Sequence, residues 1–262
     1  MPRRAFDVAA YEAAELLHLT AGKPNKHYTT ALIAAAGSST RMGSDISKQL
    51  LEIDGIPVLA RTLLAYEAAL TVQEIVLIAR REDFDAFRSL AEQYRITKLR
   101  RITEGGATRQ ESVRRGLAVA SSKTKFVAIA DGARCLITPE QIDRVNLTAY
   151  RTRAASAATP ATDTVKIVDE HHQTVSSPDR ATAWLAQTPQ TFSQPLYLAA
   201  AYYAKENFIE ATDDNALVEA TGYPVTLVDC GKENIKITAP TDVYLARAIL
   251  SHRAAMEQEE RS

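Results

Sequence analysis

LIAAAGSSTRMG, residues 32–43, is the stretch that decides how this chain folds, and Lys48 follows it closely. Its apolar start, residues 32–34, predicts a buried strand. Small residues then follow at 37–40, where the backbone can approach a ligand closely, and Arg41 and Lys48 supply two cations. Such a loop suits a triphosphate, because backbone N–H groups face the anion and the cations offset its charge.

The loop differs from two common phosphate-binding signatures. It lacks the G-x-x-x-x-G-K-[ST] pattern of a Walker loop, and only one glycine, Gly37, lies in the turn where a dinucleotide fingerprint has several. A plain strand-to-helix connection with incidental basic residues therefore stays an alternative for this segment alone.

Composition indicates a globular protein without a basic surface. The 262 residues are 46% hydrophobic and 24% charged, with a net charge of −1, which argues against nucleic-acid binding but allows one local cationic pocket. No apolar run reaches the ~18–20 residues of a membrane span. The acidic residues Asp7, Glu12 and Glu15 near the N-terminus argue against a signal or transit peptide. Cys135 and Cys230 lie far apart, so we expect reduced thiols and a cytoplasmic protein.

Strands and helices alternate from Thr30 onward. The predicted strands are 30–36, 74–80, 98–103, 125–130 and 153–160. The predicted helices between them are 57–70, 83–95, 108–120 and 139–150. Alternation of this kind predicts an α/β fold with a mostly parallel sheet, helices on both faces, and ligands at the carboxyl ends of the strands.

Residues 163–180, DTVKIVDEHHQTVSSPDR, break this alternation and predict a projecting β-hairpin arm. A lone hairpin is marginal in water, so we expect the arm to pack on a second subunit. QTPQTF at 187–192 is interpreted as a compact turn. The elements predicted after it are helices at 195–206, 213–221 and 240–256 and strands at 225–229 and 233–238.

The sequence predicts two regions, an N-terminal appendage and one folded domain. Residues 1–28 are an N-terminal appendage, which could hold a short amphipathic helix at 5–19 or be disordered. Residues 29–256 are predicted to form a single domain that carries the arm.

The strand at 98–103 is followed by a glycine pair and a helix start. Gly105 and Gly106 would let the backbone approach a flat base, and Arg109 and Ser112 would share one helical face. An ordinary glycine-rich turn before a helix is the alternative interpretation.

The strand at 125–130 is followed by Asp131 and Arg134. A carboxylate at the end of a strand suits a sugar hydroxyl or a magnesium shell, and a helix or turn cap is the alternative. The chain shows no Ser-His-Asp, Cys-His or zinc spacing, so catalysis by positioning and charge neutralisation is favoured over a covalent nucleophile.

Later candidates lie on the arm and beyond it. Thr164 lies at the start of the arm, and Arg180 at its end could grip a phosphate, although an exposed salt bridge is the alternative. Residues 212–214, TDD, are typical of a helix N-cap. Lys236 lies in the apolar stretch 233–238 that is predicted to be a strand. Burying a lysine there costs free energy unless its side chain faces a ligand.

Nine short motifs, in order, resemble the 2-C-methyl-D-erythritol 4-phosphate cytidylyltransferase (IspD) family between about Thr30 and Leu250. They are AAGSSTRMG, KQ, GGATRQESV, DGAR, DTVK, DR, QTPQTF, TDD and NIKIT. The resemblance implies a Rossmann-like fold whose arm exchanges contacts across a homodimer. It also implies transfer of CMP from CTP to 2-C-methyl-D-erythritol 4-phosphate, with magnesium on the triphosphate and release of diphosphate, in isoprenoid precursor synthesis.

The resemblance also implies roles for single residues. The catalytic cations would be Arg41, Lys48, Arg180 and Lys236. CTP would contact Ala35, Ala36, Gly37, Ser38, Gly105, Arg109, Ser112 and Asp131. The phosphorylated alcohol would contact Asp131, Arg134, Thr164, Arg180, Thr212 and Lys236. Thr164 and Arg180 would come from the partner subunit, and no residue is assigned to the metal.

Three residues depart from the family's pattern. Ser39 stands where many members have a second loop glycine, Ala130 where a histidine usually precedes the aspartate, and Cys135 where a proline usually follows the arginine. The last two put the geometry around Asp131 in question.

Three alternatives to this function stay open at this point. A relative that acts on ribitol 5-phosphate for wall or capsule polymer shares the loop, the arm and QTPQTF. A non-catalytic nucleotide-binding dimer module is a second alternative, although it would not need all four of the cations above. A sugar-transfer enzyme is the third, but no clear D-x-D motif follows a strand.

Overall fold

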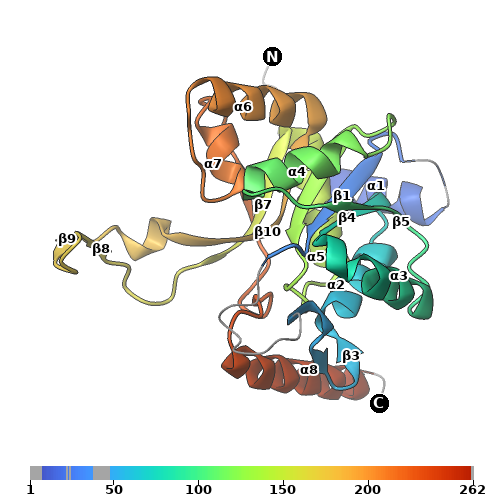
Figure 1. The fold of residues 1–262 in the computed structure, drawn as a ribbon. Coiled ribbons are helices and arrows are strands. Elements are labelled where there is room, and N and C mark those ends of the chain that lie inside the picture. The colour runs from blue at the N-terminus through green and yellow to red at the C-terminus, as the bar shows by residue number, and fades with distance from the viewer. Residues whose placement is uncertain (1–7, 22, 24, 38–47, 261–262) are drawn as a thin grey trace.

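The computed structural model describes residues 8–21, 23, 25–37 and 48–260. Its centre is a seven-stranded sheet in the order β11–β7–β10–β6–β1–β4–β5 (Figure 1). The strands are β1 (Thr29–Ala34), β4 (Val72–Ala79), β5 (Leu99–Glu104), β6 (Phe126–Asp131), β7 (Ala154–Pro160), β10 (Trp184–Ser193) and β11 (Thr226–Asp229). All neighbouring pairs are parallel except those of β10, which runs antiparallel to both β6 and β7. The predicted α/β fold is confirmed.

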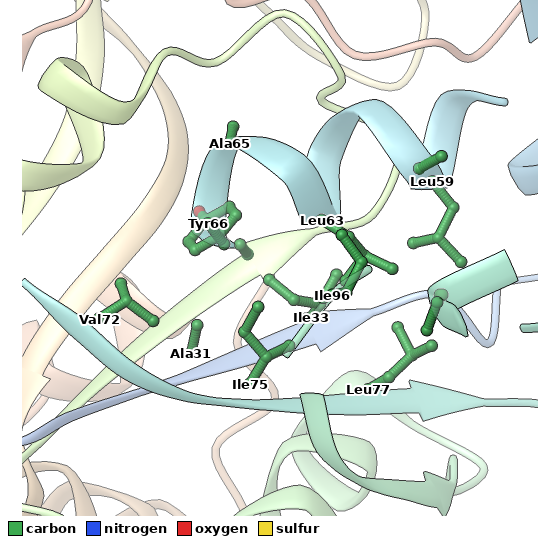
Figure 2. Packing of buried hydrophobic residues seen from close by; sticks show 14 of the residues in the cluster. Ala31, Ile33, Leu59, Leu63, Ala65, Tyr66, Val72, Ile75, Leu77 and Ile96 are labelled. Atoms are coloured by element: carbon green, nitrogen blue, oxygen red, sulfur yellow. The ribbon is translucent and has the colours of Figure 1, made fainter. Parts of the chain in front are cut away.

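Helices cover both faces of the sheet. One face carries α2 (Val58–Ala68), α3 (Phe84–Gln93) and α5 (Pro139–Thr152), and the other carries α4 (Arg109–Ala118), α6 (Gln194–Glu206) and α7 (Asp214–Glu219). The core divides in the same way, because Ala31 and Ile33 of β1 pack toward α2 whereas Leu32 packs toward α4 and α6. Figure 2 shows the first of these clusters between α2 and strands β1 and β4.

The register of the central strands brings their carboxyl ends together. Ala34 at the end of β1 lies opposite Ile78 of β4 and Asp131 of β6. A strand buried on both faces needs apolar residues on both, which explains the continuous run at the start of the stretch quoted above. The small-residue loop after β1 therefore leaves the sheet at the edge where ligands bind in such folds.

The arm projects from the sheet between β7 and β10 (Figure 1). It holds two short antiparallel strands, β8 (Ile167–Val168) and β9 (Thr174–Ser176), as the sequence predicts. Its apolar side chains are solvent-exposed, among them Ile167 at 49% and Val175 at 66%. Short 3-10 turns lie at η2 (Lys48–Leu50), η3 (Arg81–Asp83) and η4 (Arg180–Thr182).

Two sequence predictions are wrong around the last part of the chain. Residues 187–192 are not a turn but the buried half of β10. Residues 233–238 form no strand; the Ile237 N–H donates to the Ala133 carbonyl, and Ile237 packs in a cluster with α8 (Pro240–Glu260). A small ribbon of β2 (Glu52–Ile53) and β3 (Ile56–Pro57), which the sequence analysis missed, contributes to the same cluster.

Part of the N-terminal appendage is helical and docked. Helix α1 (Val8–Thr20) lies against α5, and Leu16 packs on the α5 cluster. Asn25 then donates from Nδ2 to the Thr71 carbonyl at 3.1 Å and to Tyr150 Oη at 3.1 Å. The His27 ring stacks on Tyr150 with centroids 4.1 Å apart.

Two further properties bear on the class of protein. None of the helices in the described residues is long and apolar enough to cross a membrane. Cys135 and Cys230 are both buried free thiols.

Candidate active site

A cavity of about 470 Å³ opens at the carboxyl ends of β1, β4 and β6. Its lining includes Ala36 and Gly37 after β1, Lys48 in η2, and Lys236. The remaining lining residues come from the loop after β5, the start of α4, and the strand ends: Ala34, Gln49, Ile78, Gly106, Ala107, Thr108, Arg109, Ser112, Asp131 and Ala133. The cavity thus joins the residues that the sequence motifs place far apart along the chain.

Close packing of two loops shapes one wall. A Cβ atom on Gly105 would lie 2.6 Å from the Ala36 Cβ, which is closer than two carbons can approach. Glycine is therefore required for the β5–α4 loop to lie against the β1 loop. The Thr108 hydroxyl caps α4 by accepting from the Glu111 N–H at 3.1 Å, so the helix begins at Arg109.

Arg109 lines the cavity and bridges two buried carboxylates, Asp131 and Asp214. Its Nη1 donates to Asp131 Oδ1 at 2.9 Å, and its Nε donates to Asp214 Oδ2 at 3.0 Å. The Asp214 side chain is only 1% exposed and also accepts from Tyr197 Oη at 2.7 Å. Burial lowers the pKa of Arg109, but the charges of Asp214 and Asp131 outweigh it, so Arg109 stays charged.

Asp131 is held by cations from three directions. Lys236 Nζ lies 2.9 Å from its Oδ2, and Arg134 Nε lies 3.8 Å from the same oxygen. Burial raises the pKa of Asp131, but the charges of Arg109 and Lys236 act more strongly in the opposite direction and lower it to about 2. Asp131 is therefore ionised at neutral pH. For Asp214, burial dominates over Arg109 and raises the pKa.

Polar side chains of β10 fix the acidic residues in place. The Asp131 N–H donates to Thr188 Oγ1 at 3.0 Å. Gln190 is buried; its Oε1 accepts from the Asp214 N–H at 2.9 Å and its Nε2 donates to Asp213 Oδ2 at 2.7 Å. Asp213 is the N-cap of α7, because its Oδ1 accepts from the Ala216 N–H. The strand thus ties the end of β6 to the start of α7.

The loop that carries Lys236 is anchored by a buried amide. Asn234 is fully buried and donates from Nδ2 to Gln187 Oε1 at 2.8 Å and to the Thr188 carbonyl at 3.1 Å. Arg134 Nη1 donates to the Asn234 carbonyl at 2.6 Å. These bonds hold residues 233–238 beside β10 without strand pairing, and they set Lys236 against Asp131.

The structure brings together about half of the residues that the sequence singled out. Those that line the cavity are Ala36, Gly37, Lys48, Arg109, Ser112, Asp131 and Lys236. Ala35, Gly105 and Arg134 do not line the described cavity but contact residues that do. The Ala35 N–H donates to the Ile78 carbonyl, Gly105 packs against Ala36, and Arg134 Nε lies 3.8 Å from Asp131 Oδ2. Ser38 and Arg41 lie outside the described residues, as does Ser39.

Three predicted ligands of the phosphorylated alcohol do not line the described part of the cavity. Thr212 is exposed beside the α7 cap. Thr164 and Arg180 are exposed on the arm, where Arg180 Nη1 reaches only the Thr162 carbonyl at 3.4 Å among the bonds of the described residues. Within a single chain, none of these three side chains is among the described contacts of Asp131 or Lys236.

Sequence reasoning missed two buried polar residues of the site. The TDD motif predicts a helix cap, but only Asp213 caps the helix, and Asp214 binds Arg109. Two adjacent aspartates before one helix were the available signal, because a single cap needs only one. Gln49 is 2% exposed and lines the cavity next to Lys48. The KQ motif of the family resemblance contains it, but the sequence analysis assigns it no role of its own.

The two departures near Asp131 concern the core. Ala130 is 1% exposed and packs in the cluster under α2, because alternate residues of β6 point to opposite faces. Cys135 is 5% exposed and packs with Ile53, Val58 and Ile237. Burial raises the pKa of the Cys135 thiol to about 11. Neither side chain is part of the cavity lining in the described residues.

Comparison with known proteins gives one consistent answer. The family model for 2-C-methyl-D-erythritol 4-phosphate cytidylyltransferase matches residues 29–252. A protein of that name from a Synechococcus species is 44% identical over 223 residues, which are 85% of this chain and 97% of the relative. One from Microcystis aeruginosa is 42% identical over 222 residues, 85% of this chain and 98% of the relative.

Solved structures with the same description share the fold. The crystal structure of 4-diphosphocytidyl-2C-methyl-D-erythritol synthase from Anaerococcus prevotii matches with a TM-score of 0.77 and 30% identity, over 86% of this chain and 97% of that one. The Thermus thermophilus 2-C-methyl-D-erythritol 4-phosphate cytidylyltransferase matches with a TM-score of 0.67 and 31% identity, over 85% and 98%. With the family model matching most of the chain, this protein belongs to the 2-C-methyl-D-erythritol 4-phosphate cytidylyltransferase family.

Proposed function

We propose that this protein transfers CMP from CTP to 2-C-methyl-D-erythritol 4-phosphate and releases diphosphate. The observation that carries the proposal is the cavity at the strand ends, where Asp131 lies between Arg109 and Lys236 beside the small-residue loop after β1. Ribitol 5-phosphate is the less favoured acceptor, because the family model and the relatives described above all carry the methylerythritol name.

The reaction joins two anions, so its main barrier is electrostatic. A phosphate oxygen of the alcohol attacks the α-phosphorus of CTP, one P–O bond forms, and the bond to the leaving diphosphate breaks. Among the described residues, Arg109, Arg134 and Lys236 surround Asp131, and Arg109 also binds Asp214, so three cations meet two carboxylates. Lys48 brings a further cation to the lining. Such pre-placed charges lower the repulsion between the reactants and stabilise the transition state.

The two reactants fit different parts of the cavity. We assign the triphosphate to the loop from Ala35 through Ser38 with Lys48 and Arg41, because small residues allow close backbone contact there. The base and ribose are assigned to the wall of Gly105, Arg109 and Ser112. The phosphorylated alcohol is assigned to Asp131, Arg134 and Lys236, which meet the nucleotide side at Arg109.

Magnesium fits this site as an ion carried by the nucleotide. Among the described residues no group of three or more His, Cys, Asp or Glu side chains is arranged to hold a metal. Asp131 is the carboxylate in the described lining, and Arg109 and Lys236 already bind its two oxygens. Ligation is therefore assigned to phosphate oxygens, where the ion would offset charge on the diphosphate.

A homodimer formed through the arm completes the proposal. The arm carries exposed apolar side chains, including Ile167 and Val175, and a two-stranded hairpin alone is marginal in water. A second copy seated on the arm would cover them. Thr164 and Arg180 are exposed on the arm and do not line the described part of their own chain's cavity, so they would reach the alcohol in the cavity of the partner.

The test is diphosphate release from CTP and magnesium, with 2-C-methyl-D-erythritol 4-phosphate and ribitol 5-phosphate offered separately. Turnover with the first alcohol alone is expected. Turnover with the second alone would reject the assigned acceptor but keep the reaction class. CTP binding without diphosphate release from either would reject transfer and favour a non-catalytic nucleotide-binding module.

A further inference from the structure

The loop at 105–107 is fastened to the helix that follows it by side chains of that helix. Arg115 donates from Nη1 to the Gly105 carbonyl at 2.9 Å. The Gly106 N–H donates to Ser112 Oγ at 2.9 Å. Both anchors lie in α4, so they tie the loop to the helix at these points.

The third residue of the loop is held in the same way. The Ala107 N–H donates to Glu111 Oε2 at 2.9 Å. The other carboxylate oxygen, Oε1, accepts from Arg115 Nη2 at 2.6 Å and from Arg115 Nε at 3.1 Å. Hydrogen bonds from Ala107 and then Arg115 lower the pKa of Glu111, so the carboxylate is charged at neutral pH. Glu111 and Arg115 thus act as one clamp with a contact at each end of the loop.

The clamp lies behind the cavity wall. Gly106 and Ala107 line the cavity, whereas Glu111 and Arg115 are not among its described lining residues. Two consecutive glycines leave a loop with wide conformational freedom. A loop that is ordered before a ligand arrives costs less to order at binding, which raises affinity without adding a contact.

We propose that the Glu111–Arg115 pair positions the loop of residues 105–107 for the nucleotide, so that it determines the affinity for CTP although neither side chain touches the ligand. The proposal rests on the proposed function, because it takes this wall as the nucleotide side of the cavity. Ser112 is part of that wall itself, so the clamp adds two residues to the site.

The experiment compares Arg115→Met, Arg115→Lys and Glu111→Ala in steady-state kinetics with both substrates varied. Arg115→Met and Glu111→Ala are each expected to raise KM for CTP about three- to fivefold, the scale of one exposed charged pair. The value of kcat and the KM for the alcohol are expected to stay within about twofold, because the clamp acts on the ground-state nucleotide site. Arg115→Lys keeps the charge but not the forked geometry, so it should rescue only part of the affinity.

A matched control is available on α3. Arg88 forms an exposed ion pair with Asp85 at 3.0 Å, three residues away in a helix, and within the described part of the chain it donates to no loop carbonyl. Arg88→Met removes a comparable pair and is expected to leave both KM values unchanged. The double variant Glu111→Ala/Arg115→Met should raise KM by less than the product of the two single effects, because the two side chains hold one loop.

Two results would overturn the proposal. One is a KM for CTP within the error of the wild-type value in both Arg115→Met and Glu111→Ala. The other is a parallel loss in kcat, in both KM values and in Tm, which would indicate a general structural role. If Glu111→Ala does not fold, the two Arg115 variants decide. If the wild-type protein releases no diphosphate, the proposed function fails, and equilibrium binding of CTP to the same variants still tests the clamp.

Discussion

Replacing Asp131 by asparagine keeps the size of the side chain but removes the negative charge that lies between Arg109 and Lys236. Burial raises the pKa of this carboxyl and the two cations lower it by more, with a net change from 3.8 to about 2. This lowering of the pKa corresponds to about 2 kcal/mol of stability at neutral pH. For a chain of this size, Asp131→Asn should lower Tm by about 4–8 °C.

The pH dependence of this effect has a definite sign. The folded-state pKa of Asp131 is lower than the unfolded value, so the unfolded chain binds more protons between the two. The stabilisation is therefore fully present above the unfolded pKa of 3.8 and is lost as pH falls toward about 2. Asp131→Asn lacks this group, so its deficit relative to the wild type should shrink in the same window.

The assay is urea unfolding of both proteins at pH 7, 5, 4 and 3, compared as differences so that contributions from other groups cancel. Asp85→Asn is the control, because its side chain is 96% exposed and its loss should change stability by less than about 0.5 kcal/mol. A deficit for Asp131→Asn that is absent at pH 7, or that stays constant down to pH 3, would refute the argument from paired charges.

Three further predictions test other parts of the molecule. Lys48→Ala, and equally Arg41→Ala, should lower kcat by ~10²-fold or more with Tm nearly unchanged, because each cation is assigned to the transition state; near-normal turnover would end that assignment. Arg180→Ala should mainly raise KM for the phosphorylated alcohol, and an unchanged KM would mean that the arm does not reach the site. Asn25→Ala should lower the stability by about 1–2 kcal/mol with kcat unaffected, since its amide binds the Thr71 carbonyl and Tyr150 of α5; an unaltered thermal unfolding curve would argue against docking of the appendage through Asn25.

The parallel half of the fold could be predicted because each step left a mark in the sequence. From Ala31 to Ala34 the strand before Gly37 is apolar without interruption, as a strand buried on both faces requires. The glycine at 105 indicates a close backbone approach; the structure has Ala36 of the β1 loop against it, and approach to a base stays a prediction. Arg109 and Ser112 could be placed on one helical face by their spacing alone. The meeting of these groups follows from the rule that parallel strands end at one edge.

Strand β10 escaped prediction because its residues look like a surface turn. Polar residues and a proline predict an exposed connection, whereas Gln187, Thr188 and Gln190 are all buried in the sheet. Their amides and hydroxyl are satisfied by partners from distant elements, such as the Asp131 N–H and the start of α7. Such long-range partners are invisible in a single sequence.

The opposite error occurred at residues 233–238. Alternation of polar and apolar residues predicts a strand there, but the pattern records which side chains are buried rather than any pairing of backbones. Asn234 is buried against β10 and Ile237 against α8, so the alternation reflects contacts on two sides of an irregular segment. Lys236 lies beside Asp131 because its neighbours are anchored in this way.

Strand β10 also connects the arm mechanically to the cavity. The strand leaves the arm at Trp184, and four residues later Thr188 holds the backbone of Asp131. A force on the arm would either distort the few residues before Thr188, where the pairing of β10 with β7 is interrupted after Ala186, or displace the backbone of Asp131. If two copies exchange arms as proposed, contacts on each arm would restrain the residues around Asp131 in the chain that carries it. The rigidity of each cavity would then depend on the dimer.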